Sequence, residues 1–208
     1  MLDVKKIRLI LELRESGISD SKILSAIEKI PREKFIPENF RNQAYDNLAL
    51  PIGENQTISQ PFVVAKMTQL LEVKSSHKIL EIGTGSGYQS AVLSKLVRRV
   101  YTIERIKNLL IKAEKIFQEL NISNIVPKYA DGNLGWKEQI PFDRIIITAA
   151  TPSISKEIAL QIHEGGIIVS PMVQENKQII VRYTKINNVL KSEIFDDVLF
   201  VPNLSGTQ

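Results

Sequence analysis

The chain has 208 residues, of which 43% are hydrophobic and 24% charged, and its formal net charge is +4. This composition is typical of one globular domain, and the absence of cysteine excludes disulfides, thiolate metal sites and a catalytic thiol. The basic residues are spread out and no apolar run approaches the ~18–20 residues of a membrane span, so we expect no nucleic-acid partner, no membrane association and a cytoplasmic location.

The first 50 residues are expected to form a helical extension. A first helix is predicted over 3–16, and Gly17 ends it. Its apolar residues are Ile7, Ile10, Leu11 and Leu13. Ser19 and Asp20 can cap a second helix, which Pro31 ends, and a short turn follows in PREKFIP. The apolar face of the second helix consists of Ile23, Leu24, Ile27 and Ile30.

A polar segment, GENQTISQP (53–61), lies between an aliphatic run and a third amphipathic helix. Pro61 fits the first turn of that helix, which carries Val64, Met67 and Leu71 at helical spacing. A plain connector could be shorter, so we interpret the polar segment as an active-site loop.

From residue 78 to about 172, short apolar strands alternate with helical patterns. Strands are predicted over 78–82, 99–103, 124–130 and 142–148, and helices over 88–96, 107–120 and 153–163. His163 falls in the last turn of the final helix, where a partial positive charge is favoured, and Gly165-Gly166 end that helix. Further strands are predicted at 166–172, 177–185 and around 193–202. We therefore predict an α/β fold with a doubly wound, mostly parallel sheet and antiparallel strands at its C-terminal edge.

The glycine-rich segment LEIGTGSGYQSAVL is the strongest motif. Glu81 ends the first strand of the alternating region, and Gly83, Gly85 and Gly87 form a turn tight enough for a ligand to approach the backbone. A dinucleotide-binding turn would have its third glycine where Tyr88 stands. The GxGxG spacing after an acidic residue instead resembles the S-adenosylmethionine loop of the Rossmann-like methyltransferases.

Two further acidic residues follow the next two strands. Glu104 ends the second strand, where a carboxylate can accept both ribose hydroxyls of a nucleoside; the alternative is a surface acid beside Arg105. Asp131 and Gly132 follow the third strand, where the Asp side chain can accept an adenine amino group; the alternative is an ordinary Asp-Gly turn.

The segment after the fourth strand, TAATP (148–152), is informative because of what it lacks. Methylation of base amino groups tends to use a polar residue, two prolines and an aromatic residue here, and metal-dependent phenol methylation needs carboxylates or amides. Pyrimidine-carbon methylation requires a cysteine nucleophile. A carboxylate acceptor needs no base, because it is already ionised at neutral pH. Holding it in line with a sulfonium methyl group and excluding water can supply ~7–11 kcal/mol.

A resemblance to a known family covers nearly the whole chain, from PREKFIP to Pro202. The segments GENQTISQPFVVAKM, LEIGTGSGYQSAVL, VYTIER, DGNLGW, FDRIIITAA and FVP closely resemble protein-L-isoaspartate O-methyltransferases. The resemblance implies a repair enzyme that methylates the α-carboxylate of isoaspartyl residues in damaged proteins and peptides. The ester then closes to a succinimide, which can reopen to normal aspartate. The implied cofactor is S-adenosylmethionine, with S-adenosylhomocysteine as product, and no metal is expected.

The resemblance also implies roles for individual residues. Ser59 is the catalytic residue that hydrogen-bonds or places the substrate carboxylate, and as an alternative or additional role it can cap the following helix. Gln56, Thr57 and Ile58 form the neighbouring substrate-binding loop, which closes over the cofactor. The implied cofactor-binding residues are Glu81, Gly83, Thr84, Gly85, Gly87, Glu104, Asp131 and Gly132.

The chain departs from the family pattern at a few positions. Asn55 and Ala130 stand where the family commonly has glycine, and asparagine tolerates a positive φ better than most residues. Asn203 and Leu204 depart mildly from the usual C-terminal pattern.

We predict a single monomeric methyltransferase domain over 1–208. It comprises a helical N-terminal extension (1–50), the active-site loop and helix (51–75) and a Rossmann-like core with C-terminal strands (76–208). Two alternatives stay open: a methyltransferase acting on another carboxylate or on RNA, and a protein that keeps the cofactor but only binds a partner.

Overall fold

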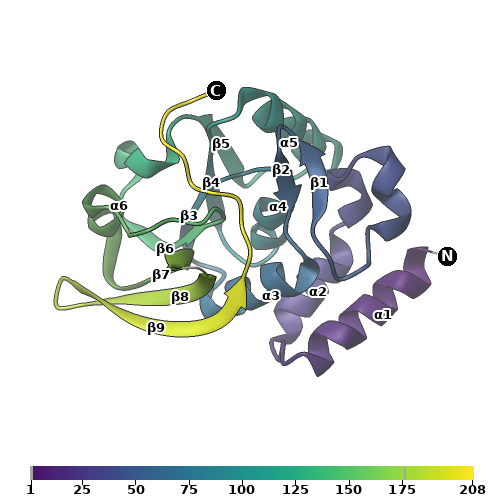
Figure 1. Ribbon diagram of the computed structural model, residues 1–208, viewed down its shortest axis with the longest axis horizontal. Coiled ribbons are helices and arrows are strands. Elements are labelled where there is room, and N and C mark those ends of the chain that lie inside the picture. Colours follow the sequence, from purple (N-terminus) through teal and green to yellow (C-terminus); the bar gives the residue numbers. More distant parts are fainter. Residues whose placement is uncertain (1, 176) are drawn as a thin grey trace.

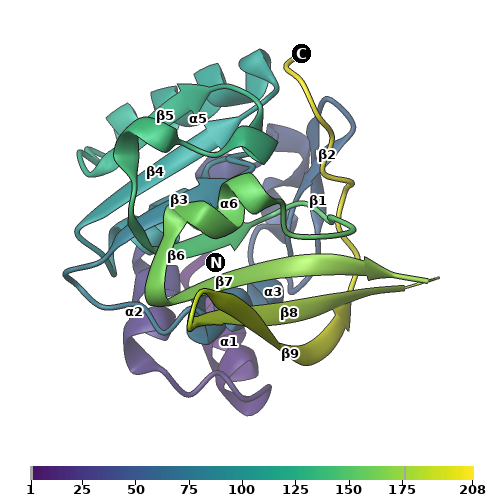
Figure 2. The ribbon, with the colours of Figure 1, turned by 90° about the vertical axis from the view of Figure 1, so that its left-hand side faces the viewer.

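The computed structural model describes residues 2–175 and 177–208. In this part of the chain a seven-stranded sheet carries helices on both faces, and a two-stranded hairpin lies apart from it (Figures 1 and 2). The α-helices are α1 (Leu2–Glu15), α2 (Ser21–Lys29), α3 (Pro61–Leu70), α4 (Tyr88–Ser94), α5 (Lys107–Glu119) and α6 (Lys156–Gln161). Short 3-10 helices are η1 (Arg32–Phe35), η2 (Glu38–Gln43), η3 (Gly132–Leu134) and η4 (Lys137–Gln139). None of the described helices is both long enough and apolar enough to cross a membrane.

The strand order of the large sheet confirms the predicted fold class. The hairpin strands are β1 (Leu50–Gly53) and β2 (Gln56–Ile58), and the sheet strands are β3 (Lys78–Ile82), β4 (Arg99–Glu104), β5 (Ile125–Tyr129), β6 (Phe142–Ile147), β7 (Ile162–Gln174), β8 (Lys177–Ile186) and β9 (Val189–Val198). The order is β5-β4-β3-β6-β7-β8-β9, parallel from β5 to β7 and antiparallel from β7 to β9. Since the winding direction reverses between β3 and β6, a ligand crevice is expected at the carboxyl ends of these two strands.

Alternate residues of the central strands face two different cores. Ile79 and Ile146 belong to a cluster formed with the residues of α1 to α5, whereas Leu80 and Ile145 belong to a cluster formed with α6. Both faces of these strands are buried, which explains why their sequences are continuous apolar runs rather than alternating patterns.

The N-terminal helices follow the prediction in one case and depart from it in the other. The four apolar residues predicted for the second helix are buried in α2 and its C-cap, Ile30, and Asp20 caps the other end by accepting a hydrogen bond from the backbone N–H of Lys22 at 2.8 Å. In α1, however, Ile7 and Leu11 are exposed, and the buried residues are Leu9 and Leu13. The helix packs on α2 and α3 along one narrow side, so only part of its apolar set finds a partner.

The prediction of a helix over 153–163 was wrong at both ends. The helix α6 is only six residues long, because Ile162 already pairs with the start of β6 and opens strand β7. Gly165-Gly166 therefore lie inside a strand and do not end a helix. His163 lies in the same strand, where its Nε2 is 3.3 Å from Oδ1 of Asp143, so its predicted place in a helix was also wrong.

The polar segment predicted as a loop is largely a β-hairpin. Leu50 of β1 pairs with Ile58 of β2, and both side chains are buried. Glu54 and Asn55 form the turn with φ values of 52° and 55°. Two positive φ values at the centre of a two-residue turn match the twist of the flanking strands. Asn55 thus adopts the conformation that the family's usual glycine would permit.

The last strand and the segment after it also differ from the prediction. The strand expected around 193–202 is β9, which begins and ends earlier. Residues 199–208 instead run as an irregular segment past the carboxyl ends of the central strands (Figure 1, yellow). This segment is fixed at Ala150, whose N–H donates to the carbonyl of Val201 at 2.8 Å and whose carbonyl accepts from the N–H of Asn203 at 2.7 Å. A C-terminal segment therefore closes one side of the predicted crevice.

Candidate active site

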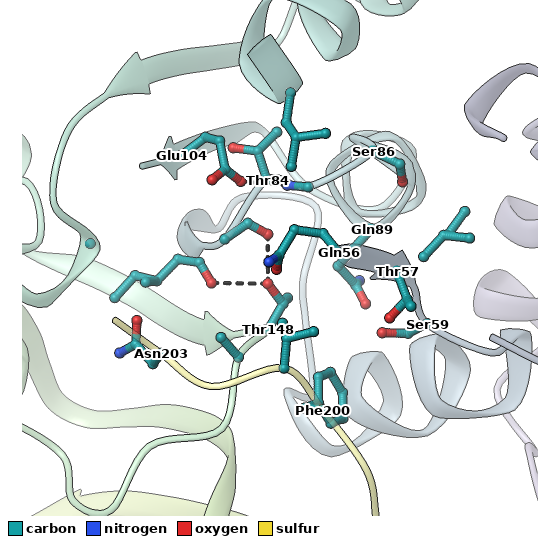
Figure 3. A pocket seen from close by; sticks show the side chains of 18 of the residues that line it. Gln56, Thr57, Ser59, Thr84, Ser86, Gln89, Glu104, Thr148, Phe200 and Asn203 are labelled. Carbon is teal, nitrogen blue, oxygen red and sulfur yellow. Dashed lines mark hydrogen bonds between the residues drawn. The ribbon is translucent and has the colours of Figure 1, made fainter. Parts of the chain in front are cut away.

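A pocket opens where the sheet order reverses, at the carboxyl ends of β3, β4 and β6. Figure 3 shows its polar side chains converging from the hairpin, the glycine turn, the end of β4 and the C-terminal segment. The lining residues are Gln56, Thr57, Ile58, Ser59, Val63, Val64, Met67, Ile82, Gly83, Thr84, Gly85, Ser86, Tyr88, Gln89, Glu104, Arg105, Ile106, Leu109, Gly132, Thr148, Ala149, Phe200, Val201, Pro202, Asn203 and Leu204.

Glu104 is held at the pocket by backbone donors on both sides. Its Oε2 accepts from the N–H of Gly85 at 2.7 Å, and its Oε1 accepts from the N–H of Ile106 at 2.9 Å. The residue is 4% exposed, and these two hydrogen bonds hold its carboxylate in one orientation. A carboxylate offers about four lone-pair positions, so each oxygen can still accept a hydroxyl from a ligand.

The glycine turn has the conformation that its sequence predicts. Gly83, Gly85 and Gly87 have φ values of 98°, 52° and 89°, a region that other residues rarely adopt. Thr148 at the end of β6 holds the start of the turn, because its Oγ1 lies 3.0 Å from the carbonyl oxygen of Ile82 and 2.5 Å from that of Gly83, and its single O–H is shared between these two acceptors. The turn is therefore fastened to the strands on both sides of it, β4 through Glu104 and β6 through Thr148.

Glu81, a predicted cofactor ligand, does not line the pocket. It is completely buried, hydrogen-bonded to the hydroxyl of Ser90, which in turn lies 3.5 Å from the Oγ1 of Thr102. The Oγ1 of Thr102 is 2.7 Å from that of Thr84 in the glycine turn. Burial raises the pKa of Glu81 to about 8, against the opposing effect of the hydroxyl hydrogen bonds, so the side chain is largely protonated at neutral pH.

The hairpin residues predicted to bind substrate all line the pocket. Figure 3 shows the side chains of Thr57 and Ser59 beside each other, across the pocket from Glu104. Gln56 lies between them and the glycine turn in the same view. The N-cap of α3 is Gln60, which makes no side-chain capping bond, so the alternative role of Ser59 as a helix cap is wrong.

The predicted adenine-side pair is divided between the pocket and the C-terminal segment. Gly132 lines the pocket, whereas Asp131 does not. The carboxylate of Asp131 accepts from the N–H of Gly206 at 2.7 Å and from the N–H of Asn133 at 2.9 Å. Burial alone would raise the pKa of Asp131, but these hydrogen bonds outweigh it and hold the pKa below its usual value. Gly87 is the third predicted residue outside the lining, where it caps α4 instead.

The sequence predictions missed much of the remaining wall. The missed polar or charged residues are Ser86, Gln89, Arg105, Thr148 and Asn203. Only the FVP segment gave a signal for the C-terminal part of the wall. Glu104 and Arg105 are the charged residues of the lining, and the described residues contain no group of three or more His, Cys, Asp or Glu that could hold a metal ion.

Comparisons with known proteins agree over almost the whole length. The family model "Protein-L-isoaspartate(D-aspartate) O-methyltransferase (PCMT)" matches residues 4–208. A protein-L-isoaspartate O-methyltransferase of Maricaulis maris is 48% identical over 204 residues, covering 98% of this chain and 96% of the relative. Another with the same name, from Paramagnetospirillum magneticum, is 52% identical over 202 residues, covering 96% and 94%.

Solved structures show the same architecture. A protein-L-isoaspartate O-methyltransferase superposes with a TM-score of 0.88 at 25% identity, covering 95% of this chain and 65% of the other. A putative protein-L-isoaspartate O-methyltransferase of Plasmodium falciparum, solved in complex with S-adenosyl-L-homocysteine, has a TM-score of 0.84 at 23% identity and covers 95% and 97%. The second likeness bears on the fold alone.

Proposed function

The chain belongs to the protein-L-isoaspartate(D-aspartate) O-methyltransferase family, and we propose that it carries out the family's reaction in the pocket between the hairpin and the glycine turn. In that reaction a methyl group passes from S-adenosylmethionine to the α-carboxylate of an L-isoaspartyl residue in a damaged protein or peptide. The observation that supports this location is that the hairpin and the glycine turn, distant in sequence, line one pocket.

The residues around the glycine turn fit S-adenosylmethionine. The fixed carboxylate of Glu104 suits a ribose diol, and the positive-φ glycines leave the backbone open to a ligand. We assign Gly83, Thr84, Gly85 and Gly132 to the same ligand because they line the pocket, whereas Glu81, Gly87 and Asp131 act from behind it. When bound, the cofactor supplies an electrophilic methyl group on a sulfonium sulfur.

The hairpin forms what we call the acceptor side of the pocket, the wall at which we place the substrate carboxylate that accepts the methyl group. An α-carboxylate is already ionised at neutral pH, so no catalytic base is required. Ser59 and Thr57 present hydroxyl groups that can donate to one carboxylate oxygen while the other is directed at the methyl group. In-line displacement between an anion and a cation reduces charge in the transition state, so excluding water from this pocket assists the reaction. The protein therefore contributes chiefly orientation and desolvation, which can supply ~7–11 kcal/mol.

Methyl transfer to a matched pair of peptides tests this function. One peptide contains isoaspartate and the other aspartate at the same position, the methyl group of S-adenosylmethionine is labelled, and the label released as methanol at high pH is counted. Base-labile label on the isoaspartyl peptide alone is the expected result. Label on both peptides, or on neither while S-adenosylhomocysteine still binds, would contradict the proposed acceptor. The monomeric state, the single domain over 1–208, the cytoplasmic location and the absence of nucleic-acid and membrane partners stay predictions.

A further inference from the structure

Arg32 is a completely buried cation that the sequence analysis did not single out. It is 0% exposed and lies in η1, outside the pocket lining. Its Nε donates to the carbonyl of Ala44 at 2.9 Å, and its two terminal nitrogens donate to the carbonyls of Leu48 at 3.2 Å and of Ser59 at 3.0 Å. One guanidinium thus joins three backbone carbonyls, and one of these belongs to Ser59, the residue predicted to place the substrate carboxylate.

A pocket-lining residue supports the same guanidinium from another side. This residue is Tyr88, the first residue of α4, directly after the glycine turn. The Cζ of Arg32 lies 5.1 Å from the centre of the Tyr88 ring. Burial lowers the pKa of Arg32 to about 10, so it is still cationic at neutral pH. Arg32 therefore connects the acceptor side of the pocket to the helix that follows the cofactor turn, and it carries a positive charge next to Ser59.

The electrostatics of the pocket make this charge significant. The substrate carboxylate is an anion, yet the lining contains no lysine and one arginine, Arg105. Arg105 donates to the carbonyl of Gly206 at 3.0 Å and to Oε1 of Gln208 at 3.3 Å, so it is engaged with the C-terminal segment. A buried charge acts over a longer distance than an exposed one because water screens it less. The guanidinium behind Ser59 is placed to favour an anion on the acceptor side.

We propose that Arg32 is a positioning residue for the methyl acceptor: its guanidinium fixes the backbone at Ser59 and supplies positive charge behind the site of the substrate carboxylate. This inference rests on the proposed function. Lysine at this position would keep the charge, but an ammonium group cannot reproduce the planar fork that reaches three separate carbonyls. The effect of Arg32→Lys should therefore appear in acceptor binding and not in cofactor binding.

Arg144 provides a matched control. It is also a buried arginine, on β6, and it also donates to three backbone carbonyls, those of Leu71 at 2.5 Å, Asp143 at 2.8 Å and Glu72 at 3.3 Å. It does not line the pocket, and its three hydrogen bonds go to no residue of the hairpin. Arg144→Lys should therefore lose a similar set of buried guanidinium hydrogen bonds, with a similar loss of stability, and leave the acceptor side of the pocket unchanged.

The test compares both variants with the wild-type protein. Arg32→Lys should raise the KM for an isoaspartyl peptide by about tenfold or more and leave the Kd for S-adenosylhomocysteine within about twofold. Arg144→Lys should lower the Tm and leave both constants within about twofold. Equal KM values for the two variants, or a parallel rise of KM and Kd in Arg32→Lys, would overturn the proposal. A wild-type protein that does not methylate the peptide would instead count against the proposed function.

A measurement on the wild-type protein covers the case in which Arg32→Lys does not fold. Nitrogen-15 NMR can follow the side-chain N–H signals of Arg32 and Arg144 with S-adenosylhomocysteine bound. Adding the isoaspartyl peptide should shift the signals of Arg32 and leave those of Arg144 in place, whereas the aspartyl peptide should shift neither. Unchanged Arg32 signals at saturating isoaspartyl peptide would show that this guanidinium does not sense the acceptor.

Discussion

The carboxylate of Glu104 at the end of β4 accepts a hydrogen bond of 2.7 Å from the backbone N–H of Gly85 in the glycine turn. Two elements that are separated by a helix in the sequence thereby form one rigid wall of the pocket. The second oxygen accepts from the N–H of Ile106 at 2.9 Å, so the side chain cannot rotate without losing a backbone partner. A carboxylate fixed in this way needs little further ordering when it binds a ribose.

Replacing Glu104 by alanine should weaken cofactor binding. Hydrogen bonds to a charged group contribute about 1.5–3 kcal/mol, so the Kd for S-adenosylhomocysteine should rise by roughly 10- to 100-fold. Isothermal titration calorimetry measures this directly. Glu138→Ala, which removes an exposed carboxylate from another part of the surface, serves as control and should leave the Kd unchanged. An unaltered Kd in Glu104→Ala would show that this carboxylate does not hold the ribose.

Replacing Ser59 by alanine should affect the acceptor and not the cofactor. The hydroxyl lies across the pocket from Glu104, so its loss should lower kcat/KM for an isoaspartyl peptide by about tenfold, corresponding to one hydrogen bond to a charged group. Binding of S-adenosylhomocysteine should change by less than about twofold. Ser75→Ala, at an exposed position, controls for the substitution itself. A comparable loss of cofactor affinity in Ser59→Ala would refute this placement.

The sequence predicted those parts of the site whose signals are local. The glycine turn, the acid at the end of β4 and Gly132, although not Asp131 beside it, each lie at or just after the end of a strand, and in a parallel sheet the carboxyl ends of strands meet at one edge. The hairpin was harder to predict, because its turn is Glu54-Asn55 and lacks the Asn-Gly pair that marks such turns most strongly.

What could not be predicted depends on contacts between distant segments. Every residue of β3 after Lys78 is buried, so the sequence could not indicate whether Glu81 faces the ligand or the Ser90 hydroxyl. The wall formed by the C-terminal segment depends on its bridge to Ala150, and the role of Arg32 depends on carbonyls 12 to 27 residues away. Such pairings leave no periodicity in the sequence.

Two glycines with similar backbone angles allow strain and packing to be separated. Gly17 and Gly87 have φ values of 93° and 89°, but a Cβ at Gly17 would meet nothing within 4 Å, whereas one at Gly87 would lie 2.8 Å from ring carbons of Phe117. Gly17→Ala should cost about 1 kcal/mol of unfolding free energy, through backbone strain alone. Gly87→Ala should cost about 2–4 kcal/mol, because overpacking adds to the strain. Urea denaturation of both variants measures the difference, and equal losses would mean that the contact with Phe117 relaxes freely.

The buried Glu81 should make stability depend on pH. Desolvation raises its pKa from 4.5 to about 8, so between these values the folded protein holds a proton that the unfolded chain has released. The stabilisation from the neutral acid is therefore complete below about pH 4.5, declines by up to about 1.4 kcal/mol per pH unit as the pH rises, and is lost above about pH 8. Glu81→Gln keeps the shape of the side chain and cannot ionise, so its free energy of unfolding should exceed that of the wild-type protein by an amount that grows from pH 5 to pH 8.

Chemical denaturation across this range, with Glu28→Gln at an exposed position as control, checks the prediction. Parallel stability profiles for the wild-type protein and Glu81→Gln would show that Glu81 is ionised in the folded state.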